Sequence, residues 1–562
     1  MIEYGSSLPA GFVDTGAAAR ELVAELRAHP WGRSSPSVYE TGRLVSLAPW
    51  LDGQAERLRF LVGTQRADGG WGLPHDGYSL VPTLSATEAL LSALATGDPA
   101  ANARRAELVK AADHGLERLS CLLAPGRDLD VPDMPAIEHI TPYLIALINA
   151  RLDGAGDGPP AGLESWHDAG PLRAPAGMGG ELLPLVRDLL DRGEAVPAKL
   201  LHALEIAGDA ARSARSVRPE RSGTVGASPA ATAAWLGPAG TAPGASEDAE
   251  RAAARRYLEA AVEQHGGPVP VAVPITEFER GWVLGWLARA GVPLQSPGRA
   301  LDDLLDGLRT SLGESGTGGG VGLPPDADTS SGALYALSLL GRPHPPDLLW
   351  NYETETHFCT WQGENGRSVT TNAHVLEAFG QYLECTGGGE RAARYAATTA
   401  KVASWLCEQQ DRDGAWRDRW HASPYYATAC AVPALARFGG DRCAGAVERA
   451  RRWVLETQRP DGSWGRWDGT VEETAYAVQI LLLRQDGPPG RDASRAAARG
   501  AAYLRTAIHR SGQNGLSMTN SVSSAEPHLW HDKDIYHPTT IVRAAILASL
   551  HLAQSRPYVT GA

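Results

Sequence analysis

The segment Gln410-Asp-Arg-Asp-Gly-Ala-Trp416 decides the fold, because the same pattern recurs at two other places in the chain. The copies are Gln65-Arg-Ala-Asp-Gly-Gly-Trp71 and Gln458-Arg-Pro-Asp-Gly-Ser-Trp464, and each follows an amphipathic helical pattern. The Asp-Gly pair favours a turn, and the glutamine can cap helix-end backbone groups. The tryptophan buries a large face and keeps one donor for a partner. We therefore interpret the repeat as a structural joint between helices and not as a catalytic motif.

The spacing of the repeat indicates two separate helical toroids. One copy lies early in the chain, and the two late copies lie 48 residues apart, about one helix pair. Helical patterns follow one another along most of the sequence, and strand-like alternation is scarce. The Gly- and Pro-rich stretches 153–178 and 217–246 are predicted to be long loops. The sequence therefore predicts an all-α fold.

Composition narrows the class of protein. A chain of 562 residues suggests two or three domains, and 43% apolar with 21% charged residues is typical of a soluble globular protein. No apolar run approaches the roughly 18–20 residues that span a bilayer, and we expect neither a transmembrane segment nor a signal peptide. Six scattered cysteines without a CxxC pair favour reduced thiols and a cytoplasmic location. The net charge of −13 argues against nucleic acid as a partner.

A candidate acid lies in the stretch 316–331, where Asp326 and Asp328 follow two prolines. The prolines favour extended backbone, in which residues i and i+2 share a face. Two carboxyls held that close do not easily both ionise, so one tends to keep its proton at neutral pH. A solvated Asp-rich turn is the alternative that these residues leave open.

The repeats together with the Asp-x-Asp segment resemble the class II terpene cyclases, which include squalene-hopene cyclases and class II diterpene cyclases. The likeness covers nearly the whole chain and is closest to bacterial prenyl diphosphate cyclases. Further similar text is found at Ser37-Val-Tyr-Glu-Thr41, Phe278-Glu-Arg-Gly-Trp-Val-Leu284, Thr370-Thr-Asn-Ala-His-Val-Leu376, Trp416–Tyr426, Glu472-Glu-Thr-Ala-Tyr476 and Leu529-Trp-His-Asp-Lys-Asp-Ile-Tyr536.

This resemblance implies two (α/α) barrels in a βγ didomain architecture. The first helix, within 1–38, would complete a β domain formed by 291–562, and 39–290 would form an inserted γ domain. The active cavity would lie between the two barrels. The oligomeric state is not predicted.

The resemblance also assigns the acid. The family motif is usually Asp-x-Asp-Asp, but here the last position is Thr329. The middle acid, Asp328, would be the general acid, and Asp326 would hold it protonated. His374 would orient the proton by hydrogen bonding, with Asn372 as a weaker candidate; an ordinary core histidine is the alternative. Thr329 is expected to be the N-cap of a helix over 329–341.

Carbocations need negative π-faces around them and no nucleophile. The aromatic candidates are Trp282, Trp286, Trp350, Trp420, Tyr425, Tyr426, Trp530 and Tyr536; of these, we predict Trp350, Trp420, Tyr425, Trp530 and Tyr536 as substrate-binding residues.

The diphosphate must be held and not expelled. Lys533 matches a recurrent lysine of the family and offers a point charge to phosphate. Arg419 is the second candidate cation; an exposed lysine and a structural ion pair are the respective alternatives. Mg²⁺ is the expected cofactor, with Asp133 and Glu138 as metal candidates from an Asp-x4-Glu pattern seen in bacterial relatives. Ordinary helix-start acids are the alternative.

Two other motifs point to competing chemistry. Asp302-Asp-Leu-Leu-Asp306 fits the motif with which class I terpene synthases ionise a diphosphate, but no matching downstream partner is present. His528, His531 and His537 lack partners at zinc spacing.

The predicted function is protonation-initiated cyclisation of a linear prenyl diphosphate, with the diphosphate retained. Geranylgeranyl diphosphate would give a labdane- or clerodane-type product, and farnesyl diphosphate a drimane-type one. The principal alternative is a non-catalytic α-toroid that binds a lipid or a partner. A carboxylate-based glycosidase is a third reading, and a prenyltransferase would need a zinc set that the sequence lacks.

Overall fold

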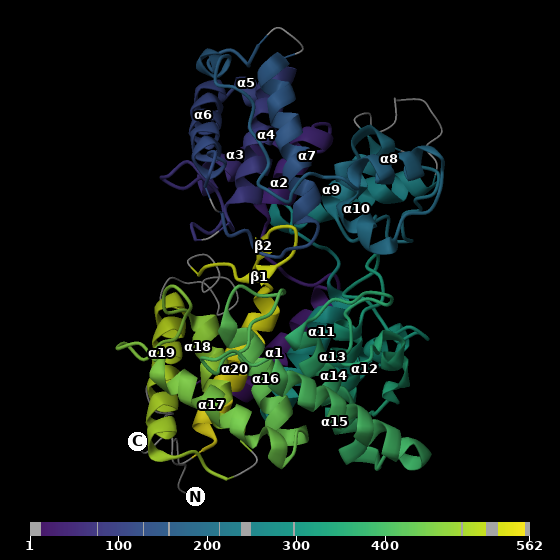
Figure 1. Ribbon diagram of the computed structural model, residues 1–562, viewed down its shortest axis with the longest axis vertical. Helices are drawn as coiled ribbons and strands as arrows, with labels where there is room; N and C mark the ends of the chain where they lie inside the picture. The colour runs from purple at the N-terminus through teal and green to yellow at the C-terminus, as the bar shows by residue number, and fades with distance from the viewer. Residues whose placement is uncertain are drawn as a thin grey trace, which may run out of the picture.

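The computed structural model describes residues 13–75, 77–127, 129–154, 158–212, 214–237, 249–295, 298–484, 487–512 and 526–556. Figure 1 shows two helical lobes, one above the other, with a small hairpin between them. The upper lobe contains α2 (Val38–Leu47), α3 (Gln54–Thr64), α4 (Leu80–Thr96), α5 (Pro99–Asn102), α6 (Arg105–Leu122), α7 (Ile137–Asp153), α8 (Leu183–Asp191), the 3-10 segment η3 (Ala198–Ala211), α9 (Pro229–Leu236) and α10 (Ala249–His265).

The lower lobe contains the first helix and the second half of the chain. Its helices are α1 (Thr15–Ala28), α11 (Thr276–Arg289), α12 (Ala300–Ser311), α13 (Ala327–Leu339), α14 (Val369–Thr386), α15 (Ala392–Glu408), α16 (Pro424–Phe438), α17 (Ala444–Glu456), α18 (Val471–Leu482), α19 (Arg491–Gly512) and α20 (Thr539–Gln554). The hairpin between the lobes pairs β1 (Trp530–His531) with β2 (Ile535–Tyr536). None of the described helices is long and apolar enough to cross a membrane.

Each lobe is a closed ring of inner helices with further helices outside it. In the lower lobe α11, α13, α14, α16, α18 and α20 pack in that order, and α20 closes on α11. In the upper lobe the ring runs through α2, α4, α7, η3 and α9 back to α2. The predicted all-α fold of two (α/α) barrels is therefore confirmed.

The repeated Gln-x3-Gly-x-Trp segments fasten the rings, as the sequence predicts. In the copy that begins at Gln410, the Nε2 atom of that residue donates to the carbonyls of Gly414 at 2.7 Å and Ala446 at 2.8 Å, which joins a turn to the next outer helix. Trp416 is fully buried, and its Nε1 atom donates to the Leu406 carbonyl at 2.8 Å. The other two copies make the equivalent bonds. Gly414 has a φ of +98°, and a Cβ there would lie 2.8 Å from the Arg449 carbonyl oxygen.

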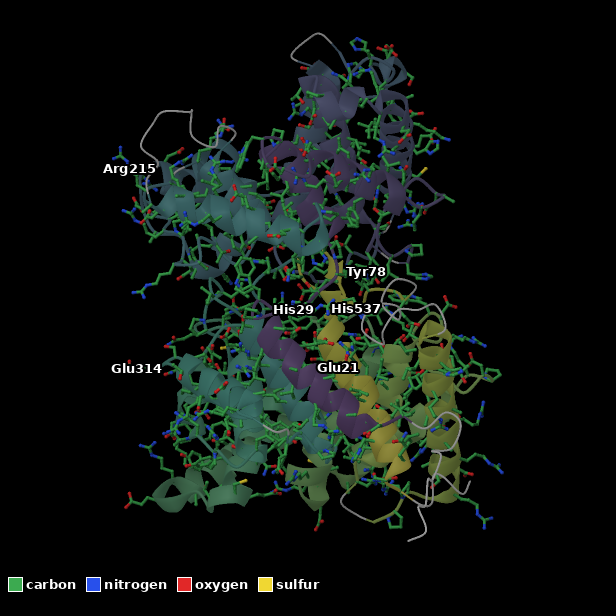
Figure 2. The ribbon with its side chains drawn as sticks, turned by 180° about the vertical axis from the view of Figure 1, so that it is seen from behind. Glu21, His29, Tyr78, Arg215, Glu314 and His537 are labelled. Atoms are coloured by element: carbon green, nitrogen blue, oxygen red, sulfur yellow. The ribbon has the colours of Figure 1, made fainter. Side chains whose placement is uncertain are left out.

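The first helix packs in the lower lobe although the upper lobe follows it in sequence. Figure 2 shows α1, marked by Glu21, beside α20. Arg543 on α20 pairs with Glu25 on α1 at 2.5 Å. The packing of α11 differs from the predicted division at residue 290, because the buried face around Trp282 joins the lower core. A boundary before α11 therefore fits the packing better, and the division into domains stays a prediction.

Candidate active site

The two acids of the Asp-x-Asp segment lie at the start of the inner helix α13. Asp326 is its N-cap, because the backbone N–H of Thr329 donates to Oδ1 at 2.6 Å and the Thr329 hydroxyl donates to Oδ2 at 2.9 Å. Asp328 lies in the first helical turn. Asp326 is extended as predicted, but Asp328 is already helical, so the predicted shared face of the two acids is wrong. The predicted N-cap at Thr329 is also wrong, because the N-cap is Asp326, three residues earlier.

Burial and proximity change the protonation of this pair. Asp326 is 8% exposed, and burial together with the charge of Asp328 raises the pKa of Asp326 to about 8, against the hydrogen bonds from Thr329. Asp326 therefore retains its proton at neutral pH.

His374, on the second turn of α14, contacts the acid directly. Its Nδ1 atom lies 2.8 Å from Oδ1 of Asp328. Burial acts to lower the pKa of His374, but the charge of Asp328 raises it well above the ordinary value. A protonated ring donates to Oδ1, and no described residue hydrogen-bonds Oδ2 of Asp328. The Trp282 ring meets the His374 ring edge-on at 4.8 Å.

Aromatic rings continue from Trp282 across the mouth of the inner ring. We call Phe278, Trp282, Tyr426, Tyr476 and Trp530 the aromatic cluster. The ring centroids of Phe278 and Trp282 lie 4.6 Å apart, those of Tyr426 and Trp530 also 4.6 Å, and those of Tyr426 and Tyr476 5.5 Å. Four of the five residues come from the first two turns of inner helices, and Trp530 from the hairpin. The acid and the π-faces therefore gather at one end of the lower barrel.

Only part of the predicted aromatic set lies here. Trp530 belongs to the aromatic cluster, and Tyr536 lies beside it at 6.4 Å. Trp350 instead stacks on Tyr395 at 5.4 Å, and Tyr425 packs against Trp453 at 4.5 Å. Trp420 meets Trp361 at 5.4 Å. Trp350, Tyr425 and Trp420 thus make no ring contact with the aromatic cluster.

A pocket of about 420 Å³ opens between the two lobes. It is lined by Arg367, Arg417, Arg419, Arg466, Asp133, Asp418, His421, His531 and Tyr78 among others, and we call it the arginine pocket. Tyr78, labelled in Figure 2, reaches it from the upper lobe. Asp418 caps α14 by accepting from the Val369 N–H at 2.8 Å. Burial raises the pKa of Asp418 to about 6, and the charge of Asp328 adds to this rise. Asp418 therefore interacts electrostatically with Asp328.

The predicted metal and amide candidates lie in different places. Asp133 lines the arginine pocket with a side chain that is 71% exposed, and its Oδ1 atom lies 3.0 Å from Arg419. Glu138 does not line this pocket and lies 3.5 Å from His139. Asn372 donates to the carbonyls of Phe358 and Ser368 and accepts from the Phe358 N–H, so it braces a loop and does not touch the acid. Among the described residues no group of three or more potential ligands could hold a metal alone.

Lys533, at the tip of the hairpin, lies inside the junction of the lobes. Its fully buried Nζ atom forms ion pairs with Glu40 and Glu205 and hydrogen bonds to Ser228 Oγ at 2.9 Å and the His202 carbonyl at 2.6 Å. Its donors are thus taken by the upper lobe. The predicted phosphate contact of Lys533 finds no support in this arrangement.

Two groups beside the aromatic cluster, His421 and Glu472, were not predicted from the sequence. His421 stacks on Tyr426 at 4.7 Å, and its Nε2 atom lies 3.0 Å from Glu472. Glu472 also accepts from Trp530. A sequence signal for Glu472 exists, because Tyr476 follows it by four residues and the two therefore share a helix face.

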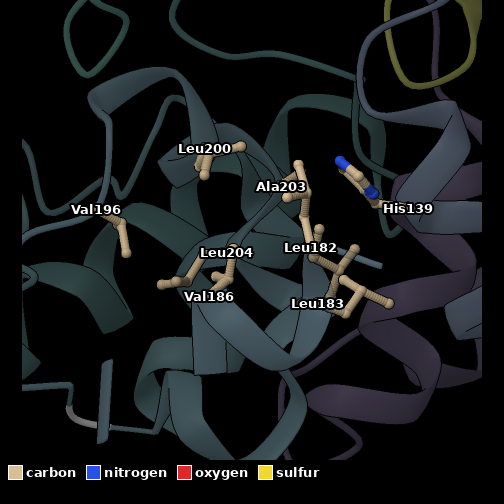
Figure 3. Close-up of a pocket in the computed structure, with 9 residues that line it drawn as sticks. His139, Leu182, Leu183, Val186, Val196, Leu200, Ala203 and Leu204 are labelled. Atoms are coloured by element: carbon tan, nitrogen blue, oxygen red, sulfur yellow. The ribbon is translucent and has the colours of Figure 1, made fainter. Parts of the chain in front are cut away.

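An apolar pocket in the upper lobe, between His139, Leu183 and Leu204, is shown in Figure 3. Its volume of about 20 Å³ holds little more than one water molecule, so it does not accommodate a prenyl chain.

Comparison with known proteins identifies the family. The squalene-hopene cyclase C-terminal domain matches residues 367–515. The chain is 42% identical to an ent-copalyl diphosphate synthase of Streptomyces sp. (strain KO-3988), over 97% of each chain. It is 38% identical to the labda-7,13-dienyl diphosphate synthase of Streptomyces clavuligerus, over 99% of this chain and 96% of that one.

A solved structure agrees as well. The ent-copalyl diphosphate synthase from Streptomyces platensis is 43% identical, with a TM-score of 0.84 over 96% of this chain and 99% of that chain. Identity at this level over nearly full length places a chain within one family. This chain therefore belongs to the bacterial class II diterpene cyclases and is a class II terpene cyclase.

Proposed function

We propose that the protein protonates the distal alkene of geranylgeranyl diphosphate and releases a bicyclic, labdane-type diphosphate. The observation that carries this proposal is the contact of Asp328 with His374 beside the aromatic cluster. It combines Asp326, whose raised pKa keeps a proton beside Asp328 at neutral pH, with neighbouring π-faces that stabilise positive charge. Relatives named for copalyl and labdadienyl diphosphates favour the C20 substrate and the retained diphosphate.

In this proposal Asp328 is the general acid and His374 orients it. His374 donates to Oδ1, and once the proton that Asp326 retains has passed to Asp328, Oδ2 carries it towards the alkene. The less substituted carbon of the distal alkene takes that proton and leaves a tertiary cation. Ring closure then moves the positive charge along the chain, and a proton lost from carbon ends the cascade. The cluster of indole and phenol rings excludes water that would capture the cation early.

The arginine pocket is the proposed place for the diphosphate. Arg367 lines the pocket and has no ion-pair partner among the described residues. Arg419 pairs with the exposed Asp133 and lies over the Trp420 ring. Arginine matches phosphate oxygens with two donors at once. Asp133 fits a Mg²⁺ ion shared with the diphosphate, since Mg²⁺ usually takes one or two carboxylates and phosphate oxygens. Glu138 lies outside the pocket and is the weaker ligand.

Product analysis tests the proposal. The protein is incubated with geranylgeranyl or farnesyl diphosphate and Mg²⁺, and the products are analysed by mass spectrometry before and after phosphatase treatment. We expect a bicyclic C20 alcohol only after phosphatase treatment. Turnover of farnesyl diphosphate alone would overturn the chain length, and release of pyrophosphate or no turnover would overturn the reaction.

A pair of arginine variants tests the diphosphate site. Arg367→Ala should raise the KM about tenfold with little change in kcat, because a hydrogen bond to a charged group contributes roughly 1.5–3 kcal/mol. Arg442→Ala is the matched control, since Arg442 lies on an exposed turn of the lower lobe outside the pocket. Equal KM values for both variants would contradict the assignment.

A further inference from the structure

Glu472 is a buried carboxylate that the mechanism above does not use. It lies in the first turn of the inner helix α18 and is 1% exposed. Its Oε1 atom accepts hydrogen bonds from Trp530 Nε1 at 2.7 Å and from the Tyr476 hydroxyl at 2.8 Å. His421 Nε2 lies 3.0 Å from the same oxygen. One carboxylate oxygen thus contacts two residues of the aromatic cluster, Trp530 and Tyr476, and the His421 imidazole, which stacks on Tyr426.

The carboxylate is held in its charged form. Burial acts to raise the pKa of Glu472, but the hydrogen bond and charge of His421, with the charge of His537 and the hydroxyl of Tyr476, leave it below the ordinary value. The second oxygen, Oε2, is buried without a hydrogen bond and lies 3.8 Å from Nδ1 of His537. An ionised group with an unused oxygen beside the aromatic cluster is costly to bury.

The surroundings supply a reason for such a charge. The inner helices begin at this end of the lower barrel, and helix N-termini carry partial positive charge. A carbocation formed there meets an unfavourable field unless carboxylates offset it. Asp326 and Asp418 cap the starts of α13 and α14, and Glu472 lies in the first turn of α18. A carboxylate that accepts from an indole or phenol also polarises the ring and makes its face more negative.

We propose that Glu472 is the counter-anion of the carbocation cascade, acting through the Trp530 and Tyr476 rings that it orients and polarises. The inference rests on the proposed cyclisation. Glu472 is therefore a positioning residue, and its charge matters after Asp328 has delivered the proton. Its loss should affect how far the cation proceeds more than how tightly the substrate binds.

The chain offers a matched control one residue away. Glu473 is also 1% exposed but has different partners: it accepts from Ser423 Oγ at 2.5 Å, Thr470 Oγ1 at 2.8 Å and the Arg466 N–H at 2.7 Å. Burial raises the pKa of Glu473 to about 7. The two neighbours share burial and helix position and differ in their contact with the aromatic cluster.

The test compares Glu472→Gln with Glu473→Gln in the full-length protein. Glu472→Gln keeps an acceptor oxygen but removes the charge, so kcat should fall on the order of 10²-fold, as when one electrostatic contact to a developing charge is lost. The KM should stay within about twofold, and the product mixture should shift to monocyclic or water-captured diphosphates. Glu473→Gln should keep the wild-type kcat and products.

Several outcomes separate the possibilities. If the wild type converts no prenyl diphosphate, the proposed function fails and not this inference alone. If the wild type is active and both variants match it in kcat and product mixture, the role of Glu472 is overturned. If Glu472→Gln does not fold, Tyr476→Phe, which keeps the ring but removes the donor to Glu472, decides: a several-fold lower kcat with altered products supports the role, and wild-type behaviour overturns it.

Discussion

Asp328 and Lys533 are both ionisable groups near the junction of the lobes, but Asp328 is half-buried and Lys533 is buried. Asp328 has one strong partner, His374 at 2.8 Å, and no described residue hydrogen-bonds its second oxygen. Lys533 is fully buried and meets two carboxylates, one hydroxyl and one carbonyl. Burial acts to lower the pKa of Lys533, but Glu205 and Glu40 raise it above the ordinary value.

The difference indicates which of the two groups is available for chemistry. A buried ion whose hydrogen bonds are all satisfied fixes one arrangement of its neighbours and has no donor left for a ligand. A half-buried acid with an unused oxygen beside π-faces can give its proton to a substrate. We therefore regard Lys533 as a joint between hairpin and upper lobe, and Asp328 as the reactive group.

Removing the acid should give the largest effect. Asp328→Asn keeps the shape of the side chain and the contact with His374 but has no acidic proton, so turnover should fall by at least about 10³-fold, near the upper range for general acid catalysis. Product formation is measured by mass spectrometry after phosphatase treatment, and circular dichroism checks the fold. Activity within tenfold of the wild type would show that another group supplies the proton.

Removing the charge of Lys533 should cost stability. Lys533→Met leaves Glu40 and Glu205 buried without their cation, which typically destabilises by about 3–5 kcal/mol. Urea unfolding measures the loss. Lys199→Met is the control, because Lys199 pairs with Glu364 at the surface, and such pairs contribute roughly 0–1 kcal/mol.

The Lys533→Met variant also separates the structural role from phosphate binding. Combining it with Glu40→Gln and Glu205→Gln should restore much of the stability, because the unpaired charges are then gone. An unchanged urea midpoint with a raised KM would instead support the phosphate contact that the sequence predicted.

Sequence reasoning was strongest where a pattern has one physical solution. The three Gln-x3-Gly-x-Trp copies predicted two helical barrels, because each joins the end of one outer helix to the next. The contact between Asp328 and His374 spans 46 residues, and only the resemblance to a family indicated it. The N-cap was misplaced because both Asp326 and Thr329 have capping side chains, and local sequence does not decide between them.

Sequence reasoning failed where the answer depends on which neighbour a side chain meets. Trp350 and Tyr425 have the composition of a cation-binding wall, yet they pack on Tyr395 and Trp453. The acidic pattern 302–306 resembles a diphosphate motif, but Asp302 and Asp306 pair with Arg342 on the surface. The spacing of residues along one helix does not reveal which side chains of the neighbouring helix will contact them.

The smallest effect concerns the acid pair and pH. Because burial and Asp328 raise the pKa of Asp326 to about 8, the folded protein holds a proton that the unfolded chain releases above its ordinary pKa near 3.9. The unfolded state then binds fewer protons, so the unfolding free energy contributed by Asp326 falls as the pH rises between about 4 and 8. Between about pH 4 and 6, His374 is protonated in both the folded and the unfolded state, so it does not contribute to the slope.

Asp326→Asn should remove this slope, which amounts to at most about 1.4 kcal/mol per pH unit for one proton. The measurement is a series of urea unfolding curves for both proteins between pH 4 and 6. Other buried acids titrate in both proteins, so their contributions cancel in the difference. If the unfolding free energies of the two proteins depended on pH in the same way, Asp326 would ionise normally when folded. The charge of Asp328 and burial would then not explain how Asp326 keeps a proton.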